Sequence, residues 1–522
     1  MITLGVWGVN AVALFDWDEI NFAESAREMV VADNFLQPTI NFTPFHEKPP
    51  LFIWLQACSF KTLGVSSFAA RLPNILCGLL TIGLLCWLPQ SRLKQSSSLW
   101  AAFLGLSVLP LLYFRSGIID PWFNLFILLG LWPSLASTKS WRDHLLGGLV
   151  LGLAVLTKGP AAGLIAGLCW LSLLWAVPED RLRRVSQYLT TGLLALAPIS
   201  IWLYFLWQQD DGFFAKEFLS YQWRLFTKED AGHGGFFGYH IVVLLIGCFP
   251  AGIFALPALL HRHTFNSPTD TGMRVLFWVV LILFSIVNTK IVHYSSLAYF
   301  PLAWFAMRGI EEGYLAKDWS RLRKGSLLIW GLYGLVSLSL PIIAWNLPQL
   351  LPRVADAELI SRLSLPVSWP WYTLLPGLII MIGGIVLWWR RRQLPLHSAA
   401  HQLLLSGLFV TAALATFTPR VQQYSQGELV AFFQHHAGTD AYLGTAYHKS
   451  YAHWFYGAVR PEVYADGCQE RQCRFHEAIS KPLYFSSPLR KTEQVLREVP
   501  DAELLYQRGG FSFYRRPANA PR

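Results

Sequence analysis

The stretch Leu145–Trp175, LLGGLVLGLAVLTKGPAAGLIAGLCWLSLLW, decides the fold of this chain. It consists of two apolar runs that are separated only by the turn TKGP. Similar apolar stretches, of roughly the length that crosses about 30 Å of hydrocarbon, recur from the N-terminus to residue 418. The pattern is typical of helices that span a membrane repeatedly and are joined by short polar connections.

The composition agrees with this interpretation. Of the 522 residues, 53% are hydrophobic and 14% are charged, and 23 Trp and 35 Phe are present. The core of a water-soluble protein cannot absorb so much apolar surface. We therefore predict a polytopic α-helical membrane protein with about 13 transmembrane helices. The apolar windows begin near Ile2, Phe68, Leu99, Ile119, Leu145, Ala161, Leu189, Tyr239, Val275, Val292, Leu327, Tyr372 and Leu403.

Topology explains the net charge of +10. Short cytoplasmic loops carry an excess of Lys and Arg, and here these residues gather in every second connection. They are Arg92 and Lys94; Lys139 and Arg142; Arg181, Arg183 and Arg184; Arg262 and Arg274; Arg321, Arg323 and Lys324; and Arg390, Arg391 and Arg392. No basic stripe with interleaved aromatic residues is present, so nucleic acid is not a predicted partner.

This charge pattern predicts two domains in a protein of the inner membrane. Residues 1–420 form the transmembrane domain, and its long first loop, 16–67, is periplasmic. Residues 421–522 form a small periplasmic α/β domain, in which strand-like runs such as Ala441–Thr445 and Phe511–Tyr514 alternate with the helix-like run Glu428–His436. Cys468 and Cys473 could close a local disulfide in that oxidising compartment, and whether they do is left open.

The polar residues of chemical interest gather on the outer face. Ionisable groups at membrane depth are costly and usually mark a pathway or a site. A positioned carboxylate can accept a proton from an attacking hydroxyl or amine, and lysines can neutralise the charge that grows on a departing lipid phosphate. The candidates are Asp18, Glu19, Lys48, Asp120, Lys158, His233, Lys290 and Tyr294. No phosphate-binding loop or dinucleotide fingerprint is found, so a nucleotide-driven mechanism is not supported.

Simpler interpretations of these residues stay open. A lone charge near a helix end is commonly solvated at the lipid headgroups, which we expect for Arg115, Lys216 and Lys228. Asp18 and Glu19 could solvate or cap a helix end, and Asp120 before Pro121 could be a helix N-cap. His233, in a Gly-rich loop, could be a surface residue. Paired carboxylates could also bind a divalent cation, although their spacing defines no site, and we predict no other cofactor.

Two motifs in the first loop carry a family resemblance. Asp16–Met29, DWDEINFAESAREM, and Phe45–Leu51, FHEKPPL, resemble the bacterial lipid A aminoarabinose transferases and their protein O-mannosyltransferase relatives, which are GT-C glycosyltransferases. The resemblance continues, in order, through Leu156–Gly159, His233–Pro250 and Lys290–Pro301. It implies a multi-spanning enzyme that uses polyprenyl-phosphate sugars outside the cytoplasmic membrane.

By this resemblance, Asp18 matches the catalytic aspartate of the family, and Lys48 matches the lysine that contacts lipid phosphate. Asp120 matches the acidic residue at the start of a later helix, and Lys158 and Lys290 match lysines that line the same cavity. The family usually has Asp-Glu-x-Arg-Tyr in this loop, whereas Asn21 and Phe22 stand at the last two positions here. Because of this departure, the donor sugar and the acceptor of the family are not assigned to this chain.

The leading prediction is a glycosyltransferase that moves a sugar from a polyprenyl-phosphate donor to a lipid, glycan or protein acceptor at the periplasmic face. Asp18 would act as the base or would orient the reacting groups, and Glu19 and Asp120 would support it. The lysines Lys48, Lys158 and Lys290 would hold the phosphate. His233 and Tyr294 would shape the pocket. The alternatives are a flippase or transporter of lipid-linked glycans, which would place polar groups at the bilayer midplane, and a noncatalytic subunit of a polysaccharide assembly complex.

Overall fold

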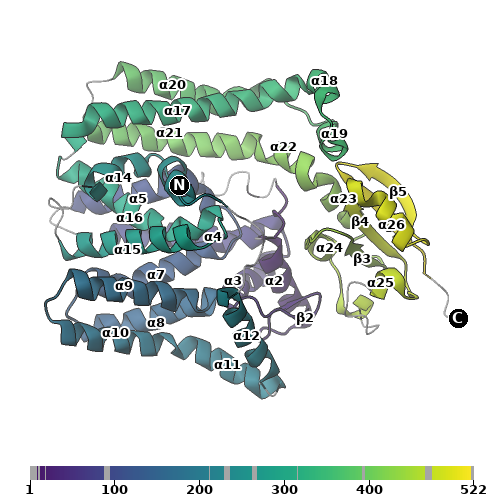
Figure 1. The fold of residues 1–522 in the computed structure, drawn as a ribbon, viewed down its shortest axis with the longest axis horizontal. Helices are drawn as coiled ribbons and strands as arrows, with labels where there is room; N and C mark the ends of the chain where they lie inside the picture. The colour runs from purple at the N-terminus through teal and green to yellow at the C-terminus, as the bar shows by residue number, and fades with distance from the viewer. Residues whose placement is uncertain are drawn as a thin grey trace.

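A computed structural model shows a long helical bundle with a small domain at one end (Figure 1). The structure describes residues 9, 12–17, 19–87, 94–210, 212–227, 235–260, 267–313, 315–390, 394–464 and 473–518. We call the end of the bundle beside the small domain the domain end. Helices α2 and α3 lie between the bundle and the small domain, so the first loop forms a layer between the two.

The bundle is built from apolar helices that run back and forth along its length. They are α4 (Ser67–Trp87), α5 (Lys94–Leu106), α6 (Val108–Tyr113), α7 (Asp120–Leu135), α8 (Trp141–Lys158), α9 (Ala161–Ala176), α10 (Arg181–Ala195), α11 (Ala197–Asp210), α12 (Phe213–Thr227), α13 (Tyr239–Val242), α14 (Ala251–Leu260), α15 (Pro268–Ile286), α16 (Tyr299–Glu311), α17 (Leu315–Trp345), α20 (Leu375–Trp389) and α21 (Pro395–Thr416). Shorter turns of helix are α18 (Leu347–Leu350), α19 (Ala357–Leu363) and the 3₁₀ segments Val292–Ala298, Leu351–Arg353 and Trp371–Leu374.

The predicted polytopic α-helical fold is confirmed, and every predicted window from Phe68 to Leu403 contains helix. Within the described ranges, six helices are long and apolar enough to cross a membrane, or seven if the bent pair Tyr239–Gly247 and Ala251–Leu260 counts as one span. The other predicted spans are shorter or interrupted helices, such as the 16-residue α7 and α9. A hydropathy window does not register these breaks. The first window, near Ile2, lies outside the described residues.

Two of the predicted basic connections meet at the end of the bundle away from the small domain. Lys139, after α7, forms an ion pair with Asp180, before α10, at 3.1 Å, and its carbonyl accepts a hydrogen bond from Arg183. Asp120 begins α7 at the opposite end of that helix. The basic residues and the candidate site residues are therefore separated along the bundle, as the charge pattern predicted.

The small domain is the predicted α/β unit. Its mixed sheet has the strand order β3-β4-β6-β5, in which β3 (Tyr442–Thr445) runs parallel to β4 (Leu483–Pro488). Strands β6 (Phe511–Arg516) and β5 (Glu503–Arg508) complete the sheet in antiparallel fashion. The helices are α22 (Thr418–Gln422), α23 (Glu428–His435), α24 (Ala452–Phe455), α25 (Cys473–His476) and α26 (Thr492–Glu498). Helical backbone continues from α21 to α23, so the chain does not break at residue 420. The side chains of the proposed Cys468–Cys473 pair lie outside the described part.

The first loop is folded against this domain. Helix α2 (Ile20–Ala32), the short hairpin β1 (Thr39–Ile40) and β2 (Thr43–Pro44), and helix α3 (Leu51–Leu63) share one apolar core with α23 and α24. The Arg27 guanidinium binds both oxygens of Glu24, at 2.7 and 2.6 Å, and also donates to the Val459 carbonyl at 2.9 Å. Because all these groups are buried, the contact fixes α2 on the domain.

Glu28, one turn further along α2, is also buried. One of its oxygens accepts hydrogen bonds from the Thr39 hydroxyl at 2.7 Å and from the Phe42 N–H at 2.9 Å. Burial and the nearby Glu24 charge raise the pKa of Glu28 well above its ordinary value. In the folded loop, Glu28 therefore stays protonated at pH values where it would be ionised in the unfolded chain.

We predict that the folded first loop weakens at alkaline pH. Glu28 holds its proton more tightly in the folded protein than in the unfolded chain, so its contribution to stability is full at acidic pH and is lost as the pH rises through the raised pKa. Thermal unfolding of the purified protein in detergent, from pH 6 to pH 9, should show a smaller loss for Glu28→Gln than for the wild type. Glu217→Gln, at an exposed position of α12, should follow the wild type. Identical profiles for wild type and Glu28→Gln would refute the prediction.

Candidate functional site

The strongest candidate for the site is an ion pair at the domain end of the bundle. Asp120 is the first residue of α7, and Lys158 is the last residue of α8. The Lys158 Nζ donates to the Asp120 Oδ1 at 2.5 Å. The side chain of Asp120 is 4% exposed and that of Lys158 is 20% exposed, so the lysine keeps a path to the outside. The N-cap position of α7 is Ile119, and the Asp120 side chain binds Lys158, so the interpretation of Asp120 as the N-cap is wrong.

Close helix packing brings the two charges together. A Cβ at Gly130 of α7 would meet the Leu151 backbone nitrogen of α8 at 2.8 Å, and a Cβ at Gly147 would meet the Gly130 carbonyl oxygen at 2.7 Å. Small residues let two helix backbones approach in this way. The close approach sets the register between α7 and α8, and this register places Lys158 opposite Asp120.

The turn after α8 connects this pair to the first loop. Gly159 has a φ of 72°, and a Cβ at this position would lie 3.2 Å from the Gln222 side-chain oxygen and 4.0 Å from Pro49. The Gln222 amide in turn donates to the Glu47 carbonyl at 3.1 Å. Residues 47–49 are therefore held over the turn, and Lys48 lies close enough to stabilise the Asp120 carboxylate electrostatically.

The segment after Lys290 adds a histidine and a tyrosine. The His293 Nε2 lies 3.8 Å from the second Asp120 oxygen, and the Lys158 Nζ lies 5.4 Å from the centre of the Tyr294 ring. We call Lys48, Asp120, Lys158, His293 and Tyr294 the Asp120 cluster. Two lysines and a histidine thus surround one carboxylate, which favours binding of a further anion.

A buried polar network fixes the histidine. The Asn124 amide donates to the Tyr113 hydroxyl and to the Ser296 hydroxyl, both at 2.8 Å. The Ser296 hydroxyl also donates to the His293 carbonyl at 2.5 Å. Asn124 lies one turn after Asp120 on α7, so the network holds the backbone of His293 against the helix that carries the carboxylate. The sequence analysis did not identify Tyr113, Asn124 or Ser296, although an Asn within an apolar helix is a signal of this kind.

Glu19 takes part in a separate buried ion pair. The Arg71 guanidinium binds both Glu19 oxygens, at 2.8 and 2.5 Å. Those oxygens also accept the N–H groups of Gly117 at 2.6 Å and Phe15 at 2.9 Å. Burial opposes ionisation of Glu19, but the Arg71 charge and these hydrogen bonds outweigh it, so the pKa of Glu19 lies below its ordinary value. Every oxygen of this carboxylate is occupied, which fits a role in positioning.

This pair holds the segment that leads into α7. Gly117 lies three residues before Asp120, and its N–H is bound by Glu19. The Asn74 amide of α4 binds the carbonyls of Ser116 and Ile118, at 2.5 and 2.6 Å. Glu19 and Asn74 therefore fix the backbone just before Asp120. Arg71 and Asn74 were also not identified from the sequence, although a cation and an amide within an apolar span are unusual.

Lys290 has a different environment. Its ammonium donates to the carbonyls of Phe284, Ser285 and Val287, at 3.1, 2.7 and 2.5 Å. These are the free carbonyls at the end of α15, so Lys290 caps that helix and stabilises its dipole. Since His293 follows three residues later, the cap also places the histidine. Contact between Lys290 and a lipid phosphate stays a prediction.

The remaining predicted residues differ in outcome. Asp18, His233 and Lys228 lie outside the described residues, so their roles stay predictions. Lys216 is exposed, as expected for a solvated cation. The same expectation is wrong for Arg115, which is 5% exposed. Position near a helix end does not reveal this, because neighbouring helices cover the side chain.

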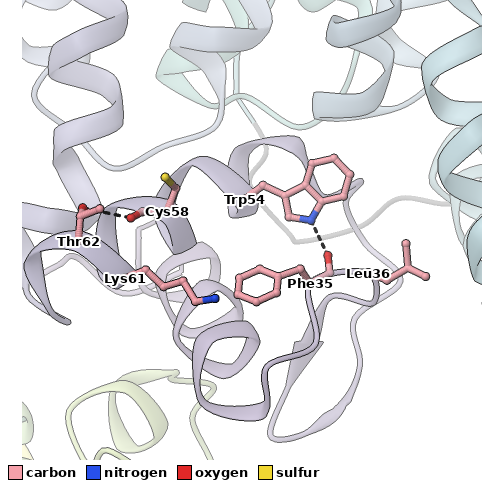
Figure 2. A pocket seen from close by; sticks show the side chains of 6 residues that line it. All are labelled: Phe35, Leu36, Trp54, Cys58, Lys61 and Thr62. Carbon is pink, nitrogen blue, oxygen red and sulfur yellow. Dashed lines mark hydrogen bonds between the residues drawn. The ribbon is translucent and has the colours of Figure 1, made fainter.

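A cavity lies elsewhere on the first loop. It has a volume of about 590 Å³ and is lined by Phe35, Leu36, Trp54, Cys58, Lys61 and Thr62 (Figure 2). The Trp54 indole donates to the Phe35 carbonyl at 2.5 Å, and the Lys61 ammonium lies 4.4 Å from the Phe35 ring centre. This groove is mostly apolar and carries no carboxylate, so its chemistry differs from that of the Asp120 cluster. Over the described part of the chain, no group of three or more His, Cys, Asp or Glu residues is placed to hold a metal ion.

The chain is similar to known proteins in sequence and in fold. The sequence profile of the dolichyl-phosphate-mannose-protein mannosyltransferase family matches residues 47–205, a range that contains Lys48, Asp120 and Lys158. The chain is 27% identical over 398 residues to the undecaprenyl phosphate-alpha-4-amino-4-deoxy-L-arabinose arabinosyl transferase of Erwinia tasmaniensis, covering 72% of this chain and 69% of the relative. It is 24% identical to the protein of the same name from an Enterobacter species, covering 72% of each.

The predicted family resemblance is confirmed. The fold comparison covers the whole chain. The crystal structure of ArnT from Cupriavidus metallidurans bound to undecaprenyl phosphate superposes with a TM-score of 0.75 at 18% identity, covering 100% of this chain and 98% of that one. The apo structure of the same protein gives a TM-score of 0.74. The bundle and the small domain therefore have the ArnT fold, and the Asp120 cluster is the candidate site within it.

We predict that Glu19→Gln destabilises the protein, because it leaves the Arg71 cation buried beside a neutral amide. Removal of one partner of a buried ion pair costs about 3–5 kcal/mol. The thermal unfolding midpoint in detergent should fall strongly at pH 7, and the difference from the wild type should shrink on acidification, because the wild type loses its contribution as the pH falls through the lowered pKa of Glu19.

A matched control is Glu462→Gln, which changes a glutamate of the small domain in the same way. It should leave the midpoint within the error of the measurement. A Glu19→Gln protein as stable as the wild type at pH 7 would show that the pair with Arg71 does not hold the segment before α7.

Proposed function

We propose that this chain transfers a sugar from a polyprenyl-phosphate donor to a lipid, glycan or protein acceptor, and that the Asp120 cluster binds the phosphate of the donor. The observation that carries the proposal is the 2.5 Å ion pair between Asp120 and Lys158, with Lys48 and His293 beside it. The cluster is a preorganised group of charges with an excess of cations, and the Asp120 carboxylate offsets part of that excess in the absence of a ligand.

The enzyme class predicted from the sequence is supported independently. The chain is a membrane glycosyltransferase of the polyprenyl-phosphate-dependent type, since both the family profile and the curated relatives carry that activity in their names. The donor of those relatives is undecaprenyl phosphate-alpha-4-amino-4-deoxy-L-arabinose. A lipid phosphate is a stable leaving group only where its charge is compensated, which is the chemistry that the two lysines can supply.

The proposed reaction exchanges one bond to the sugar for another. A hydroxyl or amine of the acceptor attacks the anomeric carbon, and the bond from that carbon to the phosphate oxygen breaks. The proton of the acceptor passes to a carboxylate, for which we propose Asp18. The phosphate gains one negative charge, which Lys158 and Lys48 offset. Glu19 acts indirectly, because it positions the segment that carries Asp120, and Lys290 positions His293.

The site is proposed to face the periplasm. The chain is a multi-pass protein of the bacterial inner membrane, and its basic connections Lys139–Arg142 and Arg181–Arg184 lie at the end of the bundle away from the Asp120 cluster. Cytoplasmic loops carry such residues, so the domain end would be periplasmic. Modification of single cysteines by an impermeant reagent in intact cells tests this orientation.

Residues 21 and 22 of the first loop bear on which sugar the chain transfers. Asn21 and Phe22 stand where the family usually has Arg and Tyr, so a neutral amide replaces a cation three residues after Asp18, the carboxylate proposed as the base. A change of charge at this position alters which sugar substituents are bound well. Mass spectrometry of lipids and glycans from cells with and without the gene would identify the sugar and its acceptor.

We predict that Lys158→Ala and Asp120→Asn each lower kcat/KM for sugar transfer by about 100-fold or more, since each disrupts the charge that faces the departing phosphate. Asp18→Asn should lower it by about 100-fold to 10,000-fold, as expected for loss of a general base. Transfer is measured in proteoliposomes, with undecaprenyl-phosphate-linked 4-amino-4-deoxy-L-arabinose as the first donor tested and an extract of cellular polyprenyl-phosphate sugars as the second.

Lys216→Ala is the matched control, because Lys216 is an exposed lysine of α12 outside the cluster. It should transfer sugar at the wild-type rate. Wild-type transfer by folded Lys158→Ala and Asp120→Asn proteins would contradict the assignment of the site. Movement of the lipid-linked sugar across the bilayer without covalent transfer would instead identify a transporter.

A further inference from the structure

Strand β5 is an exposed edge of the sheet in the small domain. Strand β6 lies on one side of it, and in the described part of the chain no strand lies on the other side. Every residue of β5 is exposed, and Figure 1 shows the strand along the outer margin of the domain. The strand at the other edge, β3, differs, because Tyr442, Leu443 and Thr445 are buried. Only one of the two edges is therefore open.

The open edge combines unpaired backbone with apolar side chains. A strand that pairs on one side leaves about half of its N–H and C=O groups unpaired. Within the described ranges, no hydrogen bond joins these groups of β5 to another segment. Three apolar residues follow one another in the middle of the strand, and Leu504, Leu505 and Tyr506 are 41%, 43% and 42% exposed. Such an edge is suited to pairing with a further strand.

A bulge decides which charges of β5 share a face. Glu503 lies opposite Arg515 of β6, Arg508 lies opposite Phe511, and the register shifts at Leu505 between them. Arg515 and Phe511 are four residues apart, so they lie on one face of the sheet. Glu503 and Arg508 lie on that same face, although an odd number of residues separates them, because the bulge adds one residue to β5.

The charges on this face are self-complementary. In an antiparallel pair of two β5 strands, related by a two-fold axis between Leu505 and Tyr506, Glu503 lies opposite Arg508 of the partner subunit. Residues directly opposite each other point to the same face, and opposite charges there stabilise the pair. The symmetry produces this contact twice, once at each end of the paired strands.

The existing ion pairs do not prevent this contact. Glu503 lies 3.7 Å from Arg515, and Arg508 lies 3.1 Å from Glu428, yet the side chains of Glu503 and Arg508 stay 59% and 52% exposed. Pairing of two copies would therefore place the charges in alternation across the junction. At its centre, Leu505 of each copy would lie opposite Tyr506 of the partner subunit, and aromatic residues form favourable pairs of this kind with aliphatic ones.

We propose that β5 is a dimer interface, in which it pairs antiparallel with β5 of a second copy of this chain, so that the two small domains share one continuous sheet. A strand of unrelated sequence would have to supply a matching base and acid at its two ends, whereas a second β5 supplies both. One pair of strands buries less area than a standard interface. Both copies are anchored in a membrane, which raises their effective concentration and favours such a weak contact.

The first test is a disulfide between two copies in the native membrane. Two differently tagged full-length chains are co-expressed, one with Glu503→Cys and the other with Arg508→Cys. Residues directly opposite in an antiparallel pair have Cα atoms about 4.5–5.5 Å apart, which a disulfide can bridge. Mild oxidation should link the two tags, and mass spectrometry of the linked peptides should identify the bond between positions 503 and 508. Glu493→Cys, at an exposed position of α26, should not link to Arg508→Cys.

The second test breaks the centre of the interface. Leu505→Lys places a charge opposite Tyr506 of the partner subunit and close to the same lysine of that subunit. Energy transfer between donor-labelled and acceptor-labelled chains in proteoliposomes should show that the dimer is weakened by about tenfold or more at equal protein-to-lipid ratio. Leu496→Lys is the matched control, because Leu496 is an exposed leucine of α26, and it should dimerise like the wild type.

Three results would overturn the proposal. One is a wild-type protein that stays monomeric at every protein-to-lipid ratio. Another is a cross-link with Glu493→Cys that is as strong as the one with Glu503→Cys, which would indicate unspecific collision. The third is unchanged dimerisation of a folded Leu505→Lys protein, which would place the interface elsewhere. Sugar transfer is not part of these measurements, so the proposed function and the dimer interface can fail independently.

Discussion

The structure depends on the buried ion pair between Glu19 and Arg71. Charges of this kind are costly in a poorly polarisable interior, so they persist only where every oxygen and nitrogen has a partner. Here the carboxylate binds Arg71 and the N–H groups of Phe15 and Gly117, and the guanidinium binds carbonyls of the N-terminal segment. One pair thus joins three parts of the chain that lie far apart in sequence.

The position of Asp120 follows from this constraint. The segment before α7 has no regular structure of its own, and it is held by Glu19 from the first loop and by Asn74 from α4. On the opposite side, the glycines of α7 and α8 bring Lys158 within 2.5 Å of the carboxylate. The close pair of helices and the fixed segment before α7 together hold the Asp120 carboxylate against the Lys158 ammonium.

The first loop links the site to the small domain. Residues 47–49 of the loop cover the turn that carries Lys158, while α2 of the same loop is anchored on Val459 by Arg27. A change at the surface of the small domain could therefore reach Lys48 through one layer of packed helix. This arrangement gives the C-terminal domain a structural connection to the proposed donor site, which its sequence alone does not suggest.

The amino-acid sequence alone predicts the membrane fold, because the length and spacing of apolar runs follow directly from the thickness of the bilayer. It also determined the placement of Asp120, Lys158 and Lys48 at one end, because short loops alternate between the two faces. The role of each charged residue depends on its tertiary contacts. Lys290 and Lys158 both lie beside short turns, yet one caps a helix and the other meets a carboxylate. Likewise, Glu19 binds Arg71 and fixes the backbone before α7, whereas Arg115 is buried. The partner and the burial of a side chain depend on which distant segments pack against it, and local sequence does not contain that information.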